Sequence, residues 1–175
     1  MNGEGITDVS GFPTPPFEFE DGEGRTIEIR EYDGERKPLL RMYEEFDPGD
    51  RAQGIPPVRG DALERWLDNI LEGVNAVAWD GDDAVGHATL VEDKGMDAHE
   101  LAIFVAQSHQ CAGVGSRLIR GVLSLAYERG VHEVWLSVER WNRAAVRLYN
   151  GVGFEKTRRE GFEIEMATRL TDGDG

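Results

Sequence analysis

The stretch Gln110-Cys111-Ala112-Gly113-Val114-Gly115 joins an apolar run, Leu101 to Val105, to an amphipathic run, Ser116 to Arg129. The first run is typical of a buried strand and the second of a helix. Glycine has no Cβ, so the backbone at this turn can approach a ligand closely. The free N–H groups of a first helical turn and the helix dipole both favour an anion. The stretch therefore predicts a phosphate or pyrophosphate site.

Hydrophobic periodicity predicts the elements around this turn. Apolar residues at alternating or helical spacing indicate strands at 26–30, 74–79, 84–91, 99–105, 131–138, 154–159 and 162–170, and helices at 39–46, 61–71, 116–129 and from Asn142 onward. Strands and helices do not alternate strictly in this order. The chain is therefore predicted to be a mixed α/β (α+β) layered domain and not a doubly wound parallel sheet.

One domain is expected over residues 25–170, because 175 residues are about the size of a single domain. Residues 1–24 are rich in glycine, acidic residues and proline, which predicts a flexible acidic arm with Phe12, Phe17 and Phe19 docking locally. Residues 171–175 are predicted to be a disordered tail. The prolines at 47–60 indicate a loop between the first two helices.

Acidic residues outnumber basic ones by 34 to 19, which gives a net charge of −15, and only three of the basic residues are lysines. An acidic, lysine-poor surface indicates adaptation to high salt, because the Debye length falls to about 3 Å at 1 M salt and screens self-repulsion. The alternative is an acidic face that attracts a cationic substrate. Either interpretation argues against nucleic acid as a partner.

Other composition features narrow the class of protein. No run approaches the roughly 18 apolar residues of a membrane span, and the N-terminus lacks a signal-peptide core, so we expect a cytoplasmic protein that does not enter a membrane. The single cysteine, Cys111, excludes an internal disulfide and a cysteine-only zinc site. No metal is expected.

The glycine stretch does not fit two common phosphate motifs. No Gly-Lys-Ser/Thr follows it, so it is not a Walker A loop, and Leu118 stands where a dinucleotide fingerprint needs its third glycine. A second pattern lies about thirty residues downstream, at Asn142-Arg143-Ala144-Ala145-Val146-Arg147-Leu148-Tyr149, followed by Gly153-Phe154.

Together the two patterns resemble the GNAT superfamily of acyl-CoA-dependent N-acetyltransferases. The family's cofactor loop, Q/R-x-x-G-x-G/A, is matched by Gln110, Gly113 and Gly115. Its later signature, N-x-x-A-x-x-L-Y-x-x-x-G-F, is matched by Asn142, Ala145, Leu148, Tyr149, Gly153 and Phe154. The resemblance covers roughly residues 25–170. It implies a mixed, mostly antiparallel central sheet flanked by helices, with splayed strands at the acyl-CoA site.

The resemblance also implies acetyl-CoA as the acyl donor, with its pantetheine arm bound by backbone groups in the gap between two strands. The pyrophosphate would lie on backbone N–H groups of the glycine loop. The donor-site residues implied in this way are Phe104, Val105, Gln110, Cys111, Ala112, Gly113, Val114, Gly115, Ser116, Asn142 and Tyr149.

Direct transfer within a ternary complex is the route that the resemblance implies, and Cys111 is not expected to act as a nucleophile. Tyr149 lies seven residues after Asn142 and so on the same helical face, where its phenol can protonate the departing thiolate. The acceptor amine must lose a proton before it attacks. Glu100 is the candidate base, with His99 and a water-mediated route as alternatives, because one bulge would change which residue faces the site.

The sequence does not specify which amine is the acceptor. The resemblance implies that early helices and late strands, around residues 38–72 and 155–168, form the acceptor pocket, but no diagnostic motif lies there. A small-molecule amine, a polyamine, a protein N-terminus and a lysine are all candidate acceptors, and both a monomer and a homodimer are open. The alternative function is a non-catalytic acyl-CoA-binding or regulatory module with the same fold.

Overall fold

The computed structural model describes residues 5–46, 57, 60–94 and 97–173, and the expected loop at 47–60 lies almost wholly outside them. Its helices are α1 (Arg36–Glu44), α2 (Gly60–Ile70), α3 (Val114–Glu128) and α4 (Arg143–Val152). Its strands are β1 (Gly5–Asp8), β2 (Phe17–Glu20), β3 (Thr26–Glu31), β4 (Val74–Asp80), β5 (Asp83–Asp93), β6 (Ala98–Val105), β7 (Glu133–Glu139), β8 (Glu155–Glu160) and β9 (Glu163–Thr171). From β3 to β9 these elements confirm the predicted order.

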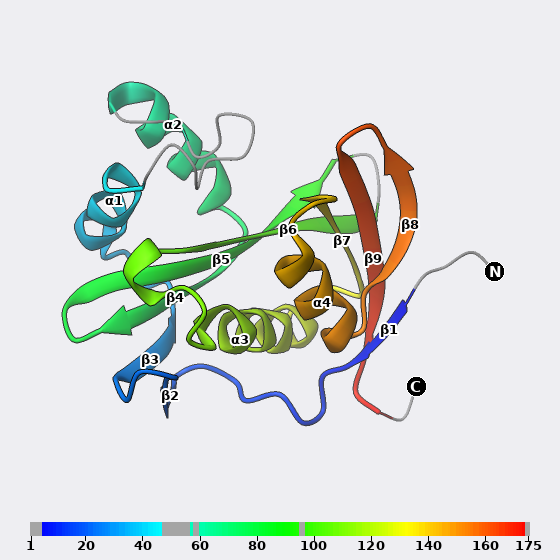
Figure 1. The fold of residues 1–175 in the computed structure, drawn as a ribbon, viewed down its shortest axis with the longest axis horizontal. Helices are drawn as coiled ribbons and strands as arrows, with labels where there is room; N and C mark the ends of the chain where they lie inside the picture. Colours follow the sequence, from blue (N-terminus) through cyan, green and yellow to red (C-terminus); the bar gives the residue numbers. More distant parts are fainter. Residues whose placement is uncertain (1–4, 47–56, 58–59, 95–96, 174–175) are drawn as a thin grey trace.

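All the strands join one sheet, in the order β1-β9-β7-β6-β5-β4-β3-β2, with β8 also paired to β9 (Figure 1). Only the β6–β7 and β1–β9 pairs are parallel. The mostly antiparallel mixed sheet with flanking helices confirms the predicted fold class.

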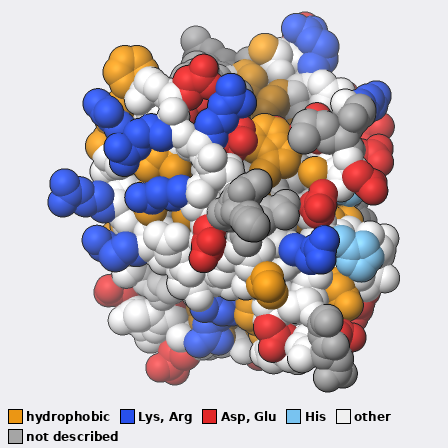
Figure 2. Space-filling model, turned by 90° about the vertical axis from the view of Figure 1, so that its right-hand side faces the viewer, with side chains coloured by type: hydrophobic (Ala, Val, Ile, Leu, Met, Phe, Trp, Pro, Cys, Tyr) orange, Lys and Arg blue, Asp and Glu red, His pale blue; other side chains and the backbone are white. Residues whose placement is uncertain are grey.

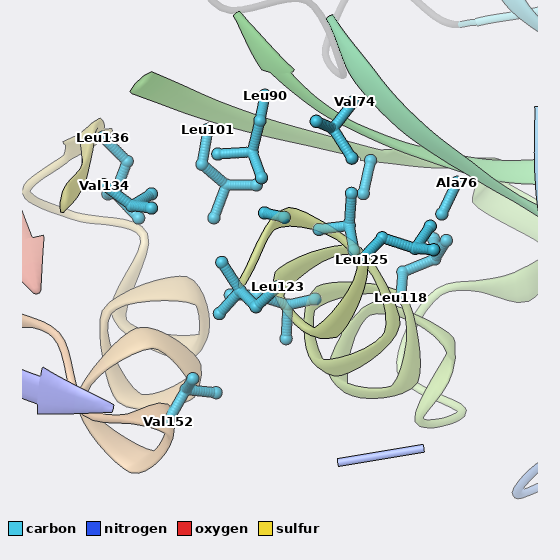
Figure 3. Packing of buried hydrophobic residues seen from close by; sticks show 14 of the residues in the cluster. Val74, Ala76, Leu90, Leu101, Leu118, Leu123, Leu125, Val134, Leu136 and Val152 are labelled. Atoms are coloured by element: carbon cyan, nitrogen blue, oxygen red, sulfur yellow. The ribbon is translucent and has the colours of Figure 1, made fainter. Parts of the chain in front are cut away.

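Side-chain alternation along the strands divides the core into two clusters on opposite faces of the sheet. On β4, Ala76 and Ala78 belong to the cluster under α3 and α4, whereas Val77 and Trp79 belong to the cluster under α1 and α2. Figure 3 shows α3 side chains directed at the first face of the sheet, where Leu118, Leu123 and Leu125 meet Val74, Ala76, Leu90 and Leu101. The sheet is therefore buried on both faces at its centre.

Strands β6 and β7 separate after a short contact. They pair only at His99–Val134 and Glu100–Trp135, whereas β6 pairs with β5 along its whole length, from Ala98 to Val105. Beyond Glu100 the two parallel strands diverge. The structure thus contains the splayed gap that the family resemblance implies, and the gap opens toward the glycine loop.

The sequence predicts a flexible arm over residues 1–24, whereas the described part of that segment contains two short strands, β1 and β2. Strand β1 pairs in parallel with β9, and β2 pairs with β3. Thr14 Oγ1 lies 2.7 Å from Ser124 Oγ on α3, and Phe12 and Phe17 pack against the core as expected. Each strand has only four residues, so its alternation of inward and outward side chains is too short to stand out among the glycines and acidic residues.

The sequence predicts a disordered tail from residue 171, whereas Thr171 pairs with Asp8 as the last residue of β9. Only residues 174–175 at this end lie outside the described part. Among the described helices, none is long and apolar enough to cross a membrane.

Candidate functional site

The glycine loop has the backbone shape that an anion site needs. Cys111 and Gly113 both have positive φ, +59° and +92°, and Gly113 caps the N-terminus of α3. The first bond of the helix runs from Arg117 N–H to Gly113 C=O at 3.3 Å. The N–H groups of Val114, Gly115 and Ser116 therefore precede the helical ladder, while the buried Val114 side chain anchors the turn in the core.

The turn between β2 and β3 braces this loop from the side. Gly22 N–H donates to Ala112 C=O at 2.9 Å, and Arg25 Nη1 donates to Ser108 C=O at 3.1 Å. Asp21 organises the turn by accepting bonds from Glu23 N–H, Arg25 N–H and Arg25 Nε. Burial alone would raise the pKa of Asp21, but these hydrogen bonds and the Arg25 charge lower it overall. No sequence motif indicated this brace.

Along the last residues of β6, the backbone groups point alternately toward β5 and toward the gap. Ala106 N–H donates to Val85 C=O of β5 at 2.9 Å. In this ladder the backbone N–H and C=O groups of Phe104 also point toward β5, and those of Ile103 and Val105 point toward the gap. The Gln110 side chain agrees, since its Nε2 donates to Val105 C=O at 3.1 Å. Backbone groups of Val105 and Ile103, more than those of Phe104, therefore line the gap.

Helix α4 forms the other wall of the loop. A Cβ added to Gly115 would lie 3.8 Å from Leu148 Cδ2, so the loop lies beside this helix with room for little more than a methyl group between them. Asn142 is the N-cap, as its residue type predicted, and its Oδ1 accepts a bond from Ala145 N–H at 3.2 Å. Tyr149 packs near Phe154, with 6.0 Å between ring centroids. Burial raises its pKa to about 12, so the phenol is protonated at neutral pH.

The two candidate bases lie on opposite faces of β6. His99 shares the α3 face with the buried Leu101 and lines a cavity of about 430 Å³ together with His132 and Arg169. Glu100 points to the other face, the side of α1 and α2, as does the Phe104 side chain. Only Glu100 therefore shares the face that α1 and α2 flank.

Partial burial at the sheet surface raises the pKa of Glu100, although its side chain keeps substantial exposure to solvent. The negative charges of Asp93, Glu163 and Glu165 raise it further. Glu163 and Glu165 alternate with the buried Ile164 and so lie on the same face as Glu100. This face is therefore rich in carboxylates next to the point where β6 and β7 diverge.

A second polar cluster lies at the far end of β6, beside a cavity of about 360 Å³ lined by residues of α1 and of the β4–β5 hairpin. His109 is buried, with Nδ1 2.7 Å from Ser108 Oγ and Nε2 2.9 Å from Asp80 Oδ2. These bonds tie the segment before the glycine loop to the hairpin. Over the part of the chain that is described, no group of three or more His, Cys, Asp or Glu residues could hold a metal ion.

Comparison with known proteins identifies the family. The profile of the Acetyltransferase (GNAT) family matches residues 37–154, about two thirds of the chain. The chain therefore belongs to the GNAT family of acetyltransferases.

Similar curated sequences carry related names over shorter matches. The mouse "N-acetyltransferase family 8 member 3" is 40% identical over 57 residues, which cover 33% of this chain and 25% of that protein. The bovine "Thialysine N-epsilon-acetyltransferase" is 31% identical over 70 residues, which cover 39% of this chain and 41% of that protein. The match thus spans between a quarter and about two fifths of the length of these relatives.

Solved structures share the fold over most of the chain. The GNAT domain of S. lividans PAT has a TM-score of 0.74 at 20% identity and covers 89% of this chain and 97% of that one. A putative acetyltransferase from Salmonella typhimurium, solved with its cofactor acetyl-CoA, has a TM-score of 0.67 at 21% identity and covers 85% and 96%. At these identities the likeness shows the fold.

Proposed function

We propose that this chain transfers an acetyl group from acetyl-CoA to a primary amine, directly and within a ternary complex. The observation that carries the proposal is the β6–β7 gap, which opens beside a helix N-terminus with three N–H groups outside the helical ladder. An extended thioester arm fits a gap between strands, and a pyrophosphate fits the free N–H groups. The acetyl-CoA named with the S. typhimurium neighbour supports the same donor.

Different residues around the gap would bind different parts of acetyl-CoA. Backbone N–H groups from Cys111 to Ser116 would hold the pyrophosphate, with Gly113 and Gly115 leaving room for it. Val105 and Ile103 would bond the pantetheine amides, and the Val105 carbonyl would exchange the Gln110 side chain for the ligand. The Asn142 side-chain amide is the remaining donor at the α4 end, since its Oδ1 already caps the helix.

Proton transfer needs a group on each side of the thioester. Glu100, on the α1 and α2 side, would take the proton from the acceptor amine directly or through a water. The neutral amine nitrogen then attacks the thioester carbonyl carbon and forms the C–N bond. As the C–S bond breaks, the nitrogen loses its second proton, which solvent returns to the group that protonates the leaving thiolate. Tyr149, on the α4 side and protonated because its pKa is about 12, would donate its proton to the leaving thiolate.

The acceptor is defined here only as a primary amine. The name of the bovine relative refers to an ε-amino group, and the carboxylates around Glu100 favour a cationic molecule. A small-molecule amine, a polyamine, a protein N-terminus and a lysine side chain all carry a cationic amino group that these carboxylates would attract.

Calorimetric titration of acetyl-CoA, followed by free-thiol release with a panel of amines in molar KCl, tests the proposal. We expect saturable one-site binding and thiol release with at least one cationic amine. A wild-type chain that does not bind acetyl-CoA would contradict the donor assignment. Tight binding with no turnover across the panel would instead identify a non-catalytic acyl-CoA-binding module.

A further inference from the structure

Acidic residues are absent from two ranges of this very acidic chain. They make up 34 of the 175 residues, about one in five, yet neither 101–127 nor 140–154 contains one. These ranges form the gap end of β6, the glycine loop and nearly all of α3, together with the turn into α4 and α4 itself. The same ranges contain five arginines, which we call the arginine collar: Arg117, Arg120, Arg140, Arg143 and Arg147.

The structure brings the collar to both sides of the glycine loop. Arg143 and Arg147 are exposed and one turn apart on α4, the helix whose Leu148 lies beside Gly115. On the other side, the Arg117 guanidinium lies 4.7 Å from the centre of the Phe19 ring. The N-terminal segment thus holds this arginine near the mouth of the loop.

Arg120 is held in a comparable way, 5.7 Å from the centre of the Phe12 ring, and it also donates to Ser116 C=O. Arg140 is the residue that follows β7 directly. Aromatic rings therefore hold Arg117 and Arg120 on one side of the loop, whereas Arg143 and Arg147 are exposed on the other.

The arginines of the collar differ from most other arginines of the chain in their partners. Within the described residues, none of its five arginines forms a salt bridge, whereas Arg25, Arg30, Arg36 and Arg129 each pair with an acidic side chain. Lys156 and Arg159 of β8 extend the positive surface. Viewed from the side of β8 and β9, Lys and Arg side chains gather on one part of the surface, with hydrophobic side chains between them (Figure 2).

Carboxylates gather on the opposite face of the sheet, where Glu100, Glu163 and Glu165 lie with Asp93 nearby, and Arg158 of β8 is the register partner of Glu165 there. Charge in this chain is therefore sorted between the two sides of the gap. A net charge of −15 repels an anion at long range, so a polyanion needs a local positive potential to approach.

We propose that the arginine collar is an electrostatic capture site for the phosphates of the acyl donor, and that it sets the rate at which the donor reaches the glycine loop. The inference rests on the proposed function, because it takes a phosphorylated acyl thioester as the ligand. The collar acts before binding is complete, so it raises the association rate more than it slows dissociation.

The test compares two double variants with the same change in net charge, from −15 to −17 on removal of two cations. Arg143→Gln/Arg147→Gln removes collar charge, and Arg65→Gln/Lys94→Gln removes two exposed cations far from the loop in sequence. Stopped-flow association of acetyl-CoA is measured at the lowest KCl concentration at which wild type is folded and again at 2 M. Circular dichroism verifies that each variant is folded.

We expect the collar variant to associate about tenfold more slowly in the lower salt and within about twofold of wild type at 2 M, because salt screens steering. The control should stay within about twofold of wild type at both concentrations. With S-acetylpantetheine, which lacks the nucleotide phosphates, the collar variant should match wild type in thiol release.

Equal association rates for the two double variants, or a collar defect that persists at 2 M KCl, would overturn the capture role while leaving the proposed function intact. A wild-type chain that binds no acetyl-CoA at either salt concentration would instead refute the proposed function and the capture role together.

Discussion

Glu100 lies beside three other carboxylates, and this neighbourhood makes a measurable prediction about pH. A base acts only when it is deprotonated, and partial burial together with Asp93, Glu163 and Glu165 raises the pKa of Glu100 above its usual range. We therefore expect kcat/KM to rise with pH through that raised pKa. Glu165→Gln should move the acidic limb of the profile to lower pH, because it removes one of the negative charges.

Glu100→Gln is the direct counterpart of this variant. It should lower kcat about a hundredfold or more and leave acetyl-CoA affinity within about twofold. The measurement is a kcat/KM profile from pH 5 to 9 for wild type, Glu100→Gln and Glu165→Gln. If the acidic limb of the kcat/KM profile does not move in Glu165→Gln, the ionisation of Glu100 does not determine that limb.

Tyr149 makes a separate prediction about the leaving group. Because burial raises its pKa to about 12, the phenol keeps its proton over the working range, and no alkaline limb below that value should come from it. Tyr149→Phe should lower kcat about tenfold to a hundredfold and change the calorimetric Kd for acetyl-CoA by less than about threefold. An equal loss in both quantities would assign Tyr149 to binding alone.

At the scale of single residues, the sequence alone predicted the structural features that depend on neighbouring residues. Gln110, Gly113 and Asn142 could be singled out because a strand-to-helix turn and an N-cap depend on neighbouring residues only. The Arg25–Ser108 contact could not, because 83 residues separate its partners and only the folded sheet brings them together. The choice between His99 and Glu100 also required the observed register, since adjacent strand residues face opposite sides.

The turn between β2 and β3 acts as one unit on the glycine loop. Asp21 accepts two backbone N–H bonds and one from Arg25 Nε, so the turn that holds Gly22 against Ala112 depends on its charge. Asp21→Asn should weaken acetyl-CoA binding several-fold, because charge-assisted bonds to the turn are lost and the loop is less well positioned. Calorimetry in molar KCl measures this change.

Asp8→Asn is the matched control for the brace. Asp8 also accepts a backbone N–H bond in a turn, from Ser10 at 2.9 Å, but it lies in β1 beside β9. It should leave the Kd for acetyl-CoA unchanged within about twofold. If both variants weaken binding equally, the effect comes from general destabilisation and not from the brace.

A buried chain of hydrogen bonds ties α1 to the sheet and makes stability depend on pH. Tyr43 Oη lies 2.6 Å from His87 Nδ1, and His87 Nε2 lies 2.7 Å from Asn75 Oδ1. Burial lowers the pKa of His87 to about 3. The unfolded chain, with an ordinary histidine pKa near 6.5, therefore binds a proton that the folded chain excludes, and stability falls as pH drops below that value.

From pH 7 to pH 5 this group alone should remove about 2 kcal/mol from the free energy of unfolding. Urea unfolding in 2 M KCl measures the free energy of unfolding of wild type and of His87→Gln at both pH values. The contribution of His87 is the difference between the two proteins in how far this free energy falls from pH 7 to pH 5. An equal fall in the free energy of unfolding for both proteins would mean that His87 does not stay neutral in the folded chain.

Element-level prediction from sequence depended on length. Helices α3 and α4 and the strands from β3 to β9 repeat their pattern over enough residues for periodicity to show. Strands β1 and β2 are stable because neighbouring strands complete them, and Phe19 of β2 is buried only in the folded core. No local feature of residues 5–20 contains that information.

At the scale of the whole molecule, the distribution of charge says more than the total. Composition left two interpretations open, adaptation to high salt and an acidic face for a cationic substrate. The acid-free ranges form the glycine loop and α4, and Glu100, Glu163 and Glu165 lie on the other side of the gap. The two interpretations are therefore compatible, because acidic residues can both cover the surface and avoid one functional region.

The remaining negative charge predicts a salt-dependent fold. At 0.1 M salt the Debye length of about 10 Å lets carboxylates repel one another across the surface, and at 1 M it is about 3 Å. Glu18 and Glu28 are a local example, directly opposite each other on β2 and β3, with Glu28 partly balanced by Arg30 at 3.2 Å. We expect the melting temperature to rise by about 4–8 °C between 0.1 and 1 M KCl, which corresponds to about 2 kcal/mol for a chain of this size.

Two controls separate screening from general salt effects. Screening is nearly complete by about 1 M, whereas stabilisation by excluded solutes continues to grow with concentration, so the curve should flatten between 1 and 3 M KCl. Glu18→Gln should raise the melting temperature at 0.1 M and leave it unchanged at 2 M, because it removes one repulsive pair that salt otherwise screens. A melting temperature that is flat from 0.1 to 1 M, or an equal effect of Glu18→Gln at both concentrations, would show that surface repulsion does not limit this fold.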